Sequence, residues 1–275
     1  MPAKLLLVAL CVLMIGVAVH FDPRRQRSLV AARTAAGPQL RLLTWNIGYA
    51  ELEHDSRAHT EDLKAVAETI LTNDPDAVAL QELIGEDQLK ILIGYLHGRY
   101  RGSVARAGNA DRVEAILVKD RQARLENVTA GERFALAATF RLAGALPEIV
   151  LISAHADAFG AAKRRVFTGA VVDWARDCSP AAVVFIAGDF NLEVHSKDES
   201  YLYTDDLKND SESYSCLLKY FRDLGREAGD TAVNDRRIDY IFGPQESVVM
   251  QRAQVLRNAA VGHMDHWPLL VEVTL

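Results

Sequence analysis

The stretch AVVFIAGDFNLE, residues 182–193, decides how this chain is built. Its first six residues are apolar, and such a run predicts a strand that is buried on both faces of a sheet. The run leads directly into Gly188-Asp189-Phe190-Asn191. Because Gly, Asp and Asn all favour turns, this motif on its own also fits an ordinary turn. The rest of the chain distinguishes a turn from a functional site.

Other apolar segments end in the same way, on a residue that can bind a metal ion or transfer a proton. Polar groups beside buried strands are costly unless they meet in one site. These residues are Asn46 after LRLLTW, Glu82 after AVALQ, His155 after IVLISA, Asp239 after RRI, and Asp265 with His266 after GHM. One such residue is usually a cap or a surface residue. With Asp189 and Asn191, however, there are eight in order along the chain, and together they predict a shared site. Neither a GxSxG nucleophile motif nor a glycine-rich phosphate loop before a helix occurs.

Helical patterns separate the apolar runs, which predicts an α/β domain over residues 40–275. Residues 60–71 combine a threonine cap, an acidic first turn and an apolar stripe. The other expected elements are helices at 161–177 and 214–224, and strands at 40–45, 77–81, 113–118, 149–154, 182–187, 238–242, 248–255 and 269–274. The polar stretch 193–214 is expected to be a surface insertion, whose Tyr201, Tyr203 and Tyr214 could contact bases or a bilayer or simply pack.

Composition places the chain among ordinary globular proteins, with 275 residues, 49% hydrophobic and 25% charged. The net charge is −6, and residues 1–38 carry +4 from five basic residues and one acidic residue, which leaves −10 for the remainder. A broad basic surface that binds polyanions is therefore not expected. Cys178 and Cys216 are too few for a disulfide framework, although one bridge stays open.

The N-terminal segment reads as a targeting element. Residues 5–21, LLLVALCVLMIGVAVHF, contain no Asp, Glu, Lys or Arg. We expect residues 1–22 to be a membrane anchor or a signal peptide and residues 23–39 to be a tether; a buried helix is a third reading. Three arginines directly after the run favour an uncleaved anchor over export. The domain is expected to be membrane-anchored or exported, on a side the sequence leaves open, and monomeric.

Six ordered segments resemble the endonuclease/exonuclease/phosphatase superfamily, which includes DNase I-like nucleases, abasic-site endonucleases, neutral sphingomyelinases and inositol-polyphosphate 5-phosphatases. They are TWNIG at 44–48, LQELIG at 80–85, SAHADA at 153–158, AGDFNLE at 187–193, RRIDYIFG at 236–243 and MDHWPLLVEV at 264–273. The resemblance implies a four-layer α/β/β/α sandwich, DNase I-like, with the site at one edge of two packed sheets.

The resemblance also implies a metal site and a set of roles. Glu82 would be the main carboxylate ligand of Mg²⁺, or of Mn²⁺ in its place, with Asn46 and Asp265 close to it. The remaining implied residues are Asp189 to orient or deprotonate the attacking water, Asn191 to hold the phosphate or that aspartate, His266 against a phosphate oxygen, Asp239 to orient His266, and His155 near the leaving oxygen. The implied reaction is direct attack of water on phosphorus.

Departures from the family patterns narrow the substrate. Gly48 and Ile84 stand where abasic-site endonucleases carry an acidic residue and a lysine, and only Arg237 of the Cys-Asp-Arg segment of the 5-phosphatases is kept. The expected function is therefore a DNase I-like nuclease acting on a phosphoester of nucleic acid. The alternatives are a membrane-proximal phosphodiesterase acting on phospholipid or sphingomyelin headgroups, and a degenerate domain that binds without catalysis.

Overall fold

The computed structural model describes residues 37–48, 60–105, 112–120, 122–130, 133–142, 147–195, 202–259 and 262–275. The leader and most of the tether expected from the sequence, residues 1–36, lie outside these ranges, as does Tyr201. Contacts divide the chain into Met1–Gly37 and Pro38–Leu275, and every described helix and strand belongs to the second unit. No helix within the described ranges has the length and apolar character needed to cross a membrane.

Two six-stranded sheets form the centre of this unit. The first has the order β11-β12-β1-β2-β4-β3 and the second β5-β6-β7-β8-β10-β9. The strands of the first are β1 Gln39–Asn46, β2 Ala77–Ile84, β3 Arg101–Ala105, β4 Arg112–Val118, β11 Val249–Val255 and β12 Leu269–Thr274. Those of the second are β5 Arg124–Ala130, β6 Arg133–Phe140, β7 Ile149–His155, β8 Val183–Asp189, β9 Phe221–Asp223 and β10 Asp239–Pro244.

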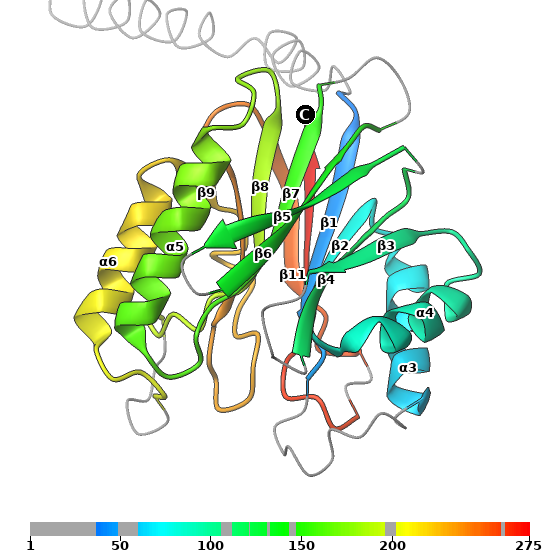
Figure 1. The fold of residues 1–275 in the computed structure, drawn as a ribbon, viewed down its shortest axis with the longest axis horizontal. Helices are drawn as coiled ribbons and strands as arrows, with labels where there is room; N and C mark the ends of the chain where they lie inside the picture. The colour runs from blue at the N-terminus through cyan, green and yellow to red at the C-terminus, as the bar shows by residue number, and fades with distance from the viewer. Residues whose placement is uncertain are drawn as a thin grey trace, which may run out of the picture. The chain divides into compact units, whose positions relative to one another are not determined.

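Among the described residues, four helices cover the outer faces of the sheets, which gives four layers (Figure 1). Helices α3 (Thr60–Asn73) and α4 (Gly85–Tyr95) pack on the first sheet, and α5 (Ala161–Arg176) and α6 (Leu207–Leu218) on the second. The alternation of side chains along β1 shows how one strand serves two cores. Leu40 and Leu42 pack between the sheets, whereas Leu43 and Trp45 pack toward α3 and α4. The structure thus has the expected DNase I-like α/β/β/α sandwich.

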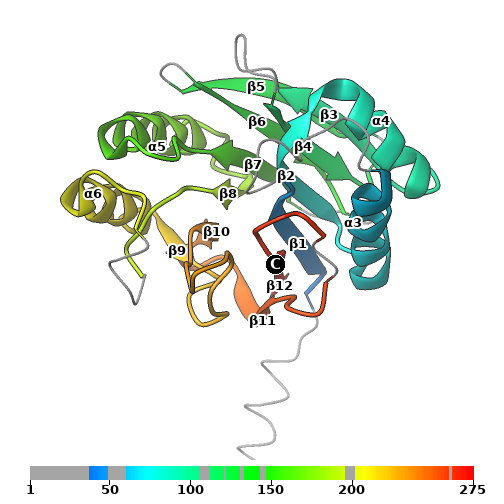
Figure 2. The same ribbon diagram turned by 90° about the horizontal axis from the view of Figure 1, so that it is seen from below.

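The strand directions bring the ends of four strands to one edge. β1 runs parallel to β2, and β7 runs parallel to β8. The C-terminus lies at the top of Figure 1, so β1, which is antiparallel to β12, ends at the bottom, and Figure 2 looks onto that end. In the second sheet His155 is paired in register with Asp189, and Asp189 with Asp239. Sheet register therefore gathers polar residues that are far apart in sequence.

The predicted helix at 214–224 is wrong in its limits. The helix there is α6, Leu207–Leu218, and the following residues form the short strand β9. Asp206 sets the start of α6 because its carboxylate accepts hydrogen bonds from the backbone N–H groups of Lys208 and Asn209. Part of the stretch expected to be a surface insertion is thus a helix, and it buries Asp210 against α5.

Several elements were not expected, while the other predicted helices and strands are present. The unexpected elements are α4, β3, β5, β6 and β9. In β5 the apolar signal is weak, because only Val128 and Ala130 are buried. β6 did carry a signal, because its apolar run ALAATF, residues 135–140, is buried throughout. Cys178 and Cys216 are both free thiols, so the bridge that the sequence left open is not formed.

Candidate active site

A bulge in β2 aims Glu82 at the strand edge. The register of β2 against β4 shifts between Leu80 and Leu83, and Glu82 has a φ of 63°. A bulge adds a residue to one strand and redirects a side chain, and such features are common beside functional sites. Asn46, at the end of β1, donates a hydrogen bond of 2.9 Å from Nδ2 to Oε1 of Glu82. Two neighbouring strand ends therefore meet at this carboxylate.

Gly48 leaves the space that the Glu82 side chain occupies. A Cβ at position 48 would overlap Oε2 of Glu82. The backbone N–H of Gly48 donates to Oδ1 of Asn46 at 2.9 Å, which turns the amide nitrogen of Asn46 toward the carboxylates. Arg112, at the start of β4, contacts Oε2 of Glu82 through Nη1. Glu82 is thus held by an amide and faces a cation of this chain.

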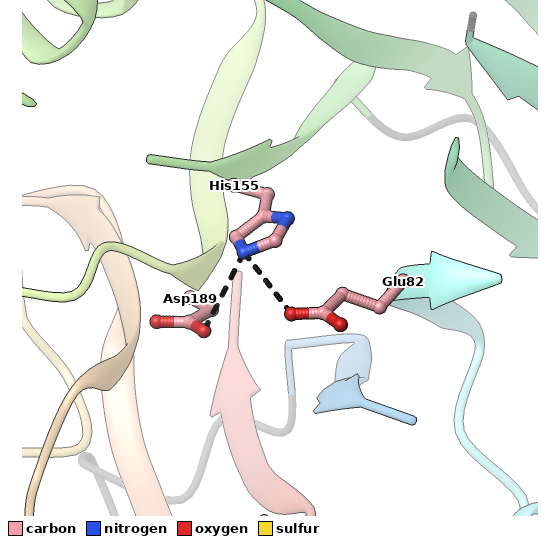
Figure 3. Close-up of side chains that lie close together, drawn as sticks. All are labelled: Glu82, His155 and Asp189. Atoms are coloured by element: carbon pink, nitrogen blue, oxygen red, sulfur yellow. Dashed lines mark ion pairs between the residues drawn. The ribbon is translucent and has the colours of Figure 1, made fainter. Parts of the chain in front are cut away.

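His155 lies between the carboxylates of Glu82 and Asp189, as Figure 3 shows. Its Nε2 is 3.5 Å from Oε1 of Glu82 and 3.7 Å from Oδ2 of Asp189, and its Nδ1 is 3.3 Å from Oε1 of Glu114. Burial acts to lower the pKa of His155, but the charge and hydrogen bond of Glu114 and the charge of Asp189 raise it above its usual value.

Asp189 is buried at the centre of the group. Its Oδ2 accepts a 3.0 Å hydrogen bond from Nδ2 of Asn46, and its Oδ1 accepts one of 2.9 Å from the backbone N–H of Asn191. Gly188, with a φ of 145°, permits this placement, because a Cβ there would overlap the carbonyl oxygen of Ala154 on β7. The Asn191 side chain donates to the carbonyl oxygen of Ala156 at 3.4 Å.

His266 and Asp239 form a buried pair on the other side of Asp189. Nδ1 of His266 lies 2.8 Å from Oδ2 of Asp239, and Nε2 of His266 lies 3.9 Å from Oδ2 of Asp189. The backbone carbonyl of His266 accepts a hydrogen bond from Nε1 of Trp45. Burial acts to lower the pKa of His266, but the adjacent Asp239 carboxylate outweighs it and raises that pKa to about 9. His266 is therefore held in one orientation, with its proton retained at neutral pH.

The structure brings most of the expected site residues into one cluster. Asn46, Glu82, His155, Asp189, Asn191, Asp239 and His266 are linked by the contacts above. Asp265 stands at the margin: its Oδ1 is 3.8 Å from Nε2 of His266, and it is more exposed than its neighbours. Within the described part of the chain, two groups of three residues have ligand atoms within 4.8 Å of one another, namely Glu82 with His155 and Asp189, and Asp189 with Asp239 and His266.

The sequence interpretation missed two residues of the cluster, both on β4. Glu114 contacts His155, and Arg112 contacts Glu82. Glu114 carried a usable signal, because it is a lone carboxylate inside the apolar run VEAILV of residues 113–118. Arg112 carried none, since a basic residue at the start of a strand is common on protein surfaces.

Comparison with solved structures places this geometry in a known fold. An endonuclease/exonuclease/phosphatase protein from Bacteroides vulgatus superposes with a TM-score of 0.68 at 18% identity, over 86% of this chain and 99% of that one. The human Nocturnin catalytic domain with a bound sulfate anion gives 0.63 at 19%, over 86% and 94%. A mannosyl-6-phosphatase from Bacteroides thetaiotaomicron gives 0.67 at 18%, over 86% and 100%. At these identities the likeness concerns the fold.

Sequence comparison identifies the family. No curated protein sequence matches the chain. The model of the Endonuclease/Exonuclease/phosphatase family, however, matches residues 43–262, which include the ends of β1, β2, β7 and β8 and all but Asp265 and His266 of the expected site. Members of this family typically hydrolyse phosphoesters and generally use divalent metals. The chain belongs to the Endonuclease/Exonuclease/phosphatase family.

Proposed function

We propose that this protein is a divalent-metal-dependent phosphodiesterase, a DNase I-like nuclease that cleaves phosphodiesters by direct attack of water. One observation carries the proposal: three side chains converge on a single atom, Oδ2 of Asp189. Nδ2 of Asn46 lies 3.0 Å from it, Nε2 of His155 lies 3.7 Å away and Nε2 of His266 lies 3.9 Å away. A buried carboxylate between two imidazoles suits proton transfer to and from a reacting phosphate.

The donor set fits a hard divalent cation. Glu82 supplies a carboxylate, and its atoms approach those of His155 and Asp189 within 4.8 Å. The guanidinium of Arg112 lies against Oε2 of Glu82, so this carboxylate is already paired with a positive charge of the chain. Glu82 would hold Mg²⁺, or Mn²⁺, with Asp265 approaching from the His266 side. Asn46 orients Glu82 in the present conformation, since its amide nitrogen faces that carboxylate. The bound ion would supply charge neutralisation at the phosphate oxygens.

The chain's own residues account for the proton movements. Asp189 accepts a proton from the attacking water, and its alignment is kept by Asn46 and the backbone of Asn191. His266 retains its proton because of Asp239, so it can donate a hydrogen bond to a non-bridging phosphate oxygen. His155, held through Nδ1 by Glu114, presents Nε2 to the leaving oxygen and can donate a proton to it.

A second candidate function follows from the leader. Residues 5–21 are apolar and uncharged, which favours an anchor or signal peptide at residues 1–22 and a location at a membrane or beyond it. In that setting the same chemistry would act on phospholipid or sphingomyelin headgroups. Resistance of the full chain to alkaline extraction from membranes, lost on deletion of residues 1–22, would support the anchor; release by alkali would refute it.

A panel assay separates these functions. The full chain is incubated with Mg²⁺ and supercoiled plasmid, RNA, sphingomyelin or phospholipid vesicles, and a phosphomonoester. We expect nicking of plasmid, its loss in Glu82→Gln and His266→Ala, and its retention in Glu68→Gln, an exposed glutamate on α3. Headgroup release without nicking would replace the nuclease by the lipid phosphodiesterase. Inactivity on all four substrates across several metals, with intact folding, would refute the proposal.

A further inference from the structure

Two adjoining hollows open beside the catalytic cluster, at the ends of α5 and α6 that face the site. The first, of about 560 Å³, lies between residues 157–160, which follow β7, and residues 202–205, which precede α6. The second, of about 500 Å³, lies between α5 and the β5–β6 pair. They share Asp157 and Lys163 as lining residues. Because Asp157 is two residues beyond His155, a group bound here can belong to the molecule whose phosphate is cleaved.

Exposed apolar side chains concentrate in these hollows. Among the described residues six large apolar side chains are exposed, and three of the six line the hollows: Phe159 (68% exposed), Val166 (63%) and Tyr203 (50%). Single exposed apolar residues are ordinary, whereas a group of them around a concavity indicates a binding surface. Two of the three, Phe159 and Tyr203, are aromatic and line the same hollow.

The ring of Tyr203 is fixed in position from behind. The guanidinium of Arg236 lies 4.4 Å from the ring centroid. Arg236 is itself buried and donates from Nε to Oε1 of Glu193 at 2.6 Å. Glu193 follows Asn191 by two residues. Because one face of the ring rests on a buried ion pair while half of the side chain stays exposed, Tyr203 presents a preorganised flat surface.

The opposite wall is anchored to the catalytic cluster as well. The carboxylate of Asp157 accepts hydrogen bonds from the backbone N–H groups of Phe159 (3.1 Å) and Gly160 (2.7 Å). Arg133 donates to the backbone carbonyl of His155 at 3.2 Å and contacts Asp157 at 3.4 Å. The position of Phe159 is therefore set by the same segment that carries His155.

The charges of the first hollow suit a neutral ring. Its two carboxylates, Asp157 and Asp205, accept backbone hydrogen bonds, the latter from Ala161. Lys163 is the cation in its lining, and its Nζ lies 3.9 Å from Asp157. A second phosphate would meet two carboxylates here. A bilayer also fits poorly, because these aromatic side chains line a concavity beside acidic groups. A flat, uncharged ring fits better, because the carboxylates do not repel it and it is small enough to enter the concavity.

We propose that this hollow binds a nucleobase of the substrate, stacked on the free face of Tyr203 with Phe159 as the second aromatic wall. The inference rests on the proposed phosphodiesterase function and specifies its substrate as a nucleic acid with an unstacked base beside the scissile phosphate. Stacking on aromatic side chains is tolerant of sequence, because every base has a π-face.

Two esters with the same leaving group test the subsite in the full chain. They are thymidine 5′-(p-nitrophenyl phosphate) and methyl p-nitrophenyl phosphate, which lacks the base. We expect Tyr203→Ala and Phe159→Ala to raise KM for the thymidine ester by about 5- to 150-fold, to leave kcat unchanged, and to leave the methyl ester unaffected. Tyr203→Phe keeps the ring and should retain wild-type KM. Val249→Ala, on the exposed face of β11, is the matched control.

The outcomes distinguish this subsite from the proposed function. Equal losses for both esters, or no change for either, would overturn the nucleobase assignment. If the wild type cleaves neither ester, the proposed phosphodiesterase function is decided by the plasmid assay, and saturation-transfer NMR with thymidine 5′-monophosphate tests the hollow directly. Contact of the base that disappears in Tyr203→Ala supports the subsite. Equal contact of the base in the wild type and in Tyr203→Ala overturns the subsite. Binding of both proteins to phosphatidylcholine vesicles is measured in parallel, and a Tyr203→Ala variant that loses only vesicle binding also overturns it.

Discussion

Replacing Arg164 by methionine should destabilise the domain strongly, because Arg164 is the charged centre of the α5–α6 contact. The side chain is fully buried, and so is its partner Asp210. Nε donates to Oδ1 of Asp210 at 2.8 Å and Nη2 to Oδ2 at 3.0 Å. Nη1 donates to the carbonyl of Asp157, and Nη2 also to the hydroxyl of Thr204. One guanidinium thus joins α5, α6 and both walls of the first hollow, residues 157–160 and residues 202–205.

The magnitude follows from what the substitution leaves behind. Methionine fills much of the volume but leaves the Asp210 carboxylate buried beside one remaining donor, the backbone N–H of Glu193 at 3.3 Å. Breaking one side of a buried ion pair costs about 3–5 kcal/mol. The free energy of unfolding of a domain is about 5–15 kcal/mol, so the variant should unfold at a much lower denaturant concentration than the wild type. In Arg164→Met/Asp210→Leu no unpaired charge stays buried, so most of the loss should be recovered.

Urea unfolding followed by circular dichroism measures these free energies in the wild type, the two single variants and the double variant. Arg165→Met is the matched control. Arg165 forms an exposed ion pair with Glu212 at 2.7 Å, and such pairs contribute about 0–1 kcal/mol to stability. A loss below about 1 kcal/mol for Arg164→Met, or a double variant as unstable as the sum of the single variants, would refute the reasoning.

Three further predictions concern the site. Asp239→Asn should lower the pKa of His266 from about 9, because burial, which acts to lower it, is then opposed only by the charges of Asp189 and Asp265. A raised folded pKa contributes stability that is present below about pH 6.5 and is lost as the pH rises through 9. NMR titration and unfolding between pH 6 and 10 should therefore both change, and an unchanged pKa would contradict the pairing. Gly48→Ala should displace the Glu82 carboxylate, which its Cβ would overlap, and weaken Mg²⁺ binding by calorimetry; unaltered affinity would show that Glu82 is not a ligand. Glu114→Gln should lower the pKa of the β7 histidine that it contacts, which histidine NMR can follow; no shift would exclude that contact in solution.

The sequence predicted the strands of the centre well, because a buried strand must be apolar on both faces. β8 and β7 are of this kind, and each leads into a site residue at its end. The limits of α6 were not predictable from periodicity, since its buried positions include Asp210, which is tolerated only because Arg164 meets it from α5. Such a pairing is tertiary information and leaves no trace in a local pattern.

The site was predictable in composition but not in geometry. Strand-end residues such as Glu82 and Asp189 stood out because they followed apolar runs. The bulge that turns Glu82 toward Asn46 depends on how β2 pairs with β4, and the contact of Glu114 with His155 joins strands of different sheets. Roles that depend on distances across two sheets therefore required the structure.

Glu82 is proposed to make phosphodiester hydrolysis depend on a divalent metal. The most direct measurement combines calorimetric titration of Mg²⁺ with cleavage of thymidine 5′-(p-nitrophenyl phosphate), for the wild type, Glu82→Gln and the exposed control Glu68→Gln. Mutation of a residue that only hydrogen-bonds to a metal ligand typically costs about 10- to 100-fold in metal affinity. Loss of the main carboxylate ligand should therefore cost at least as much in both Mg²⁺ affinity and cleavage rate, while the control behaves as wild type. Cleavage that persists in chelator, or a Glu82→Gln variant that binds Mg²⁺ and cleaves like the wild type, would contradict the account.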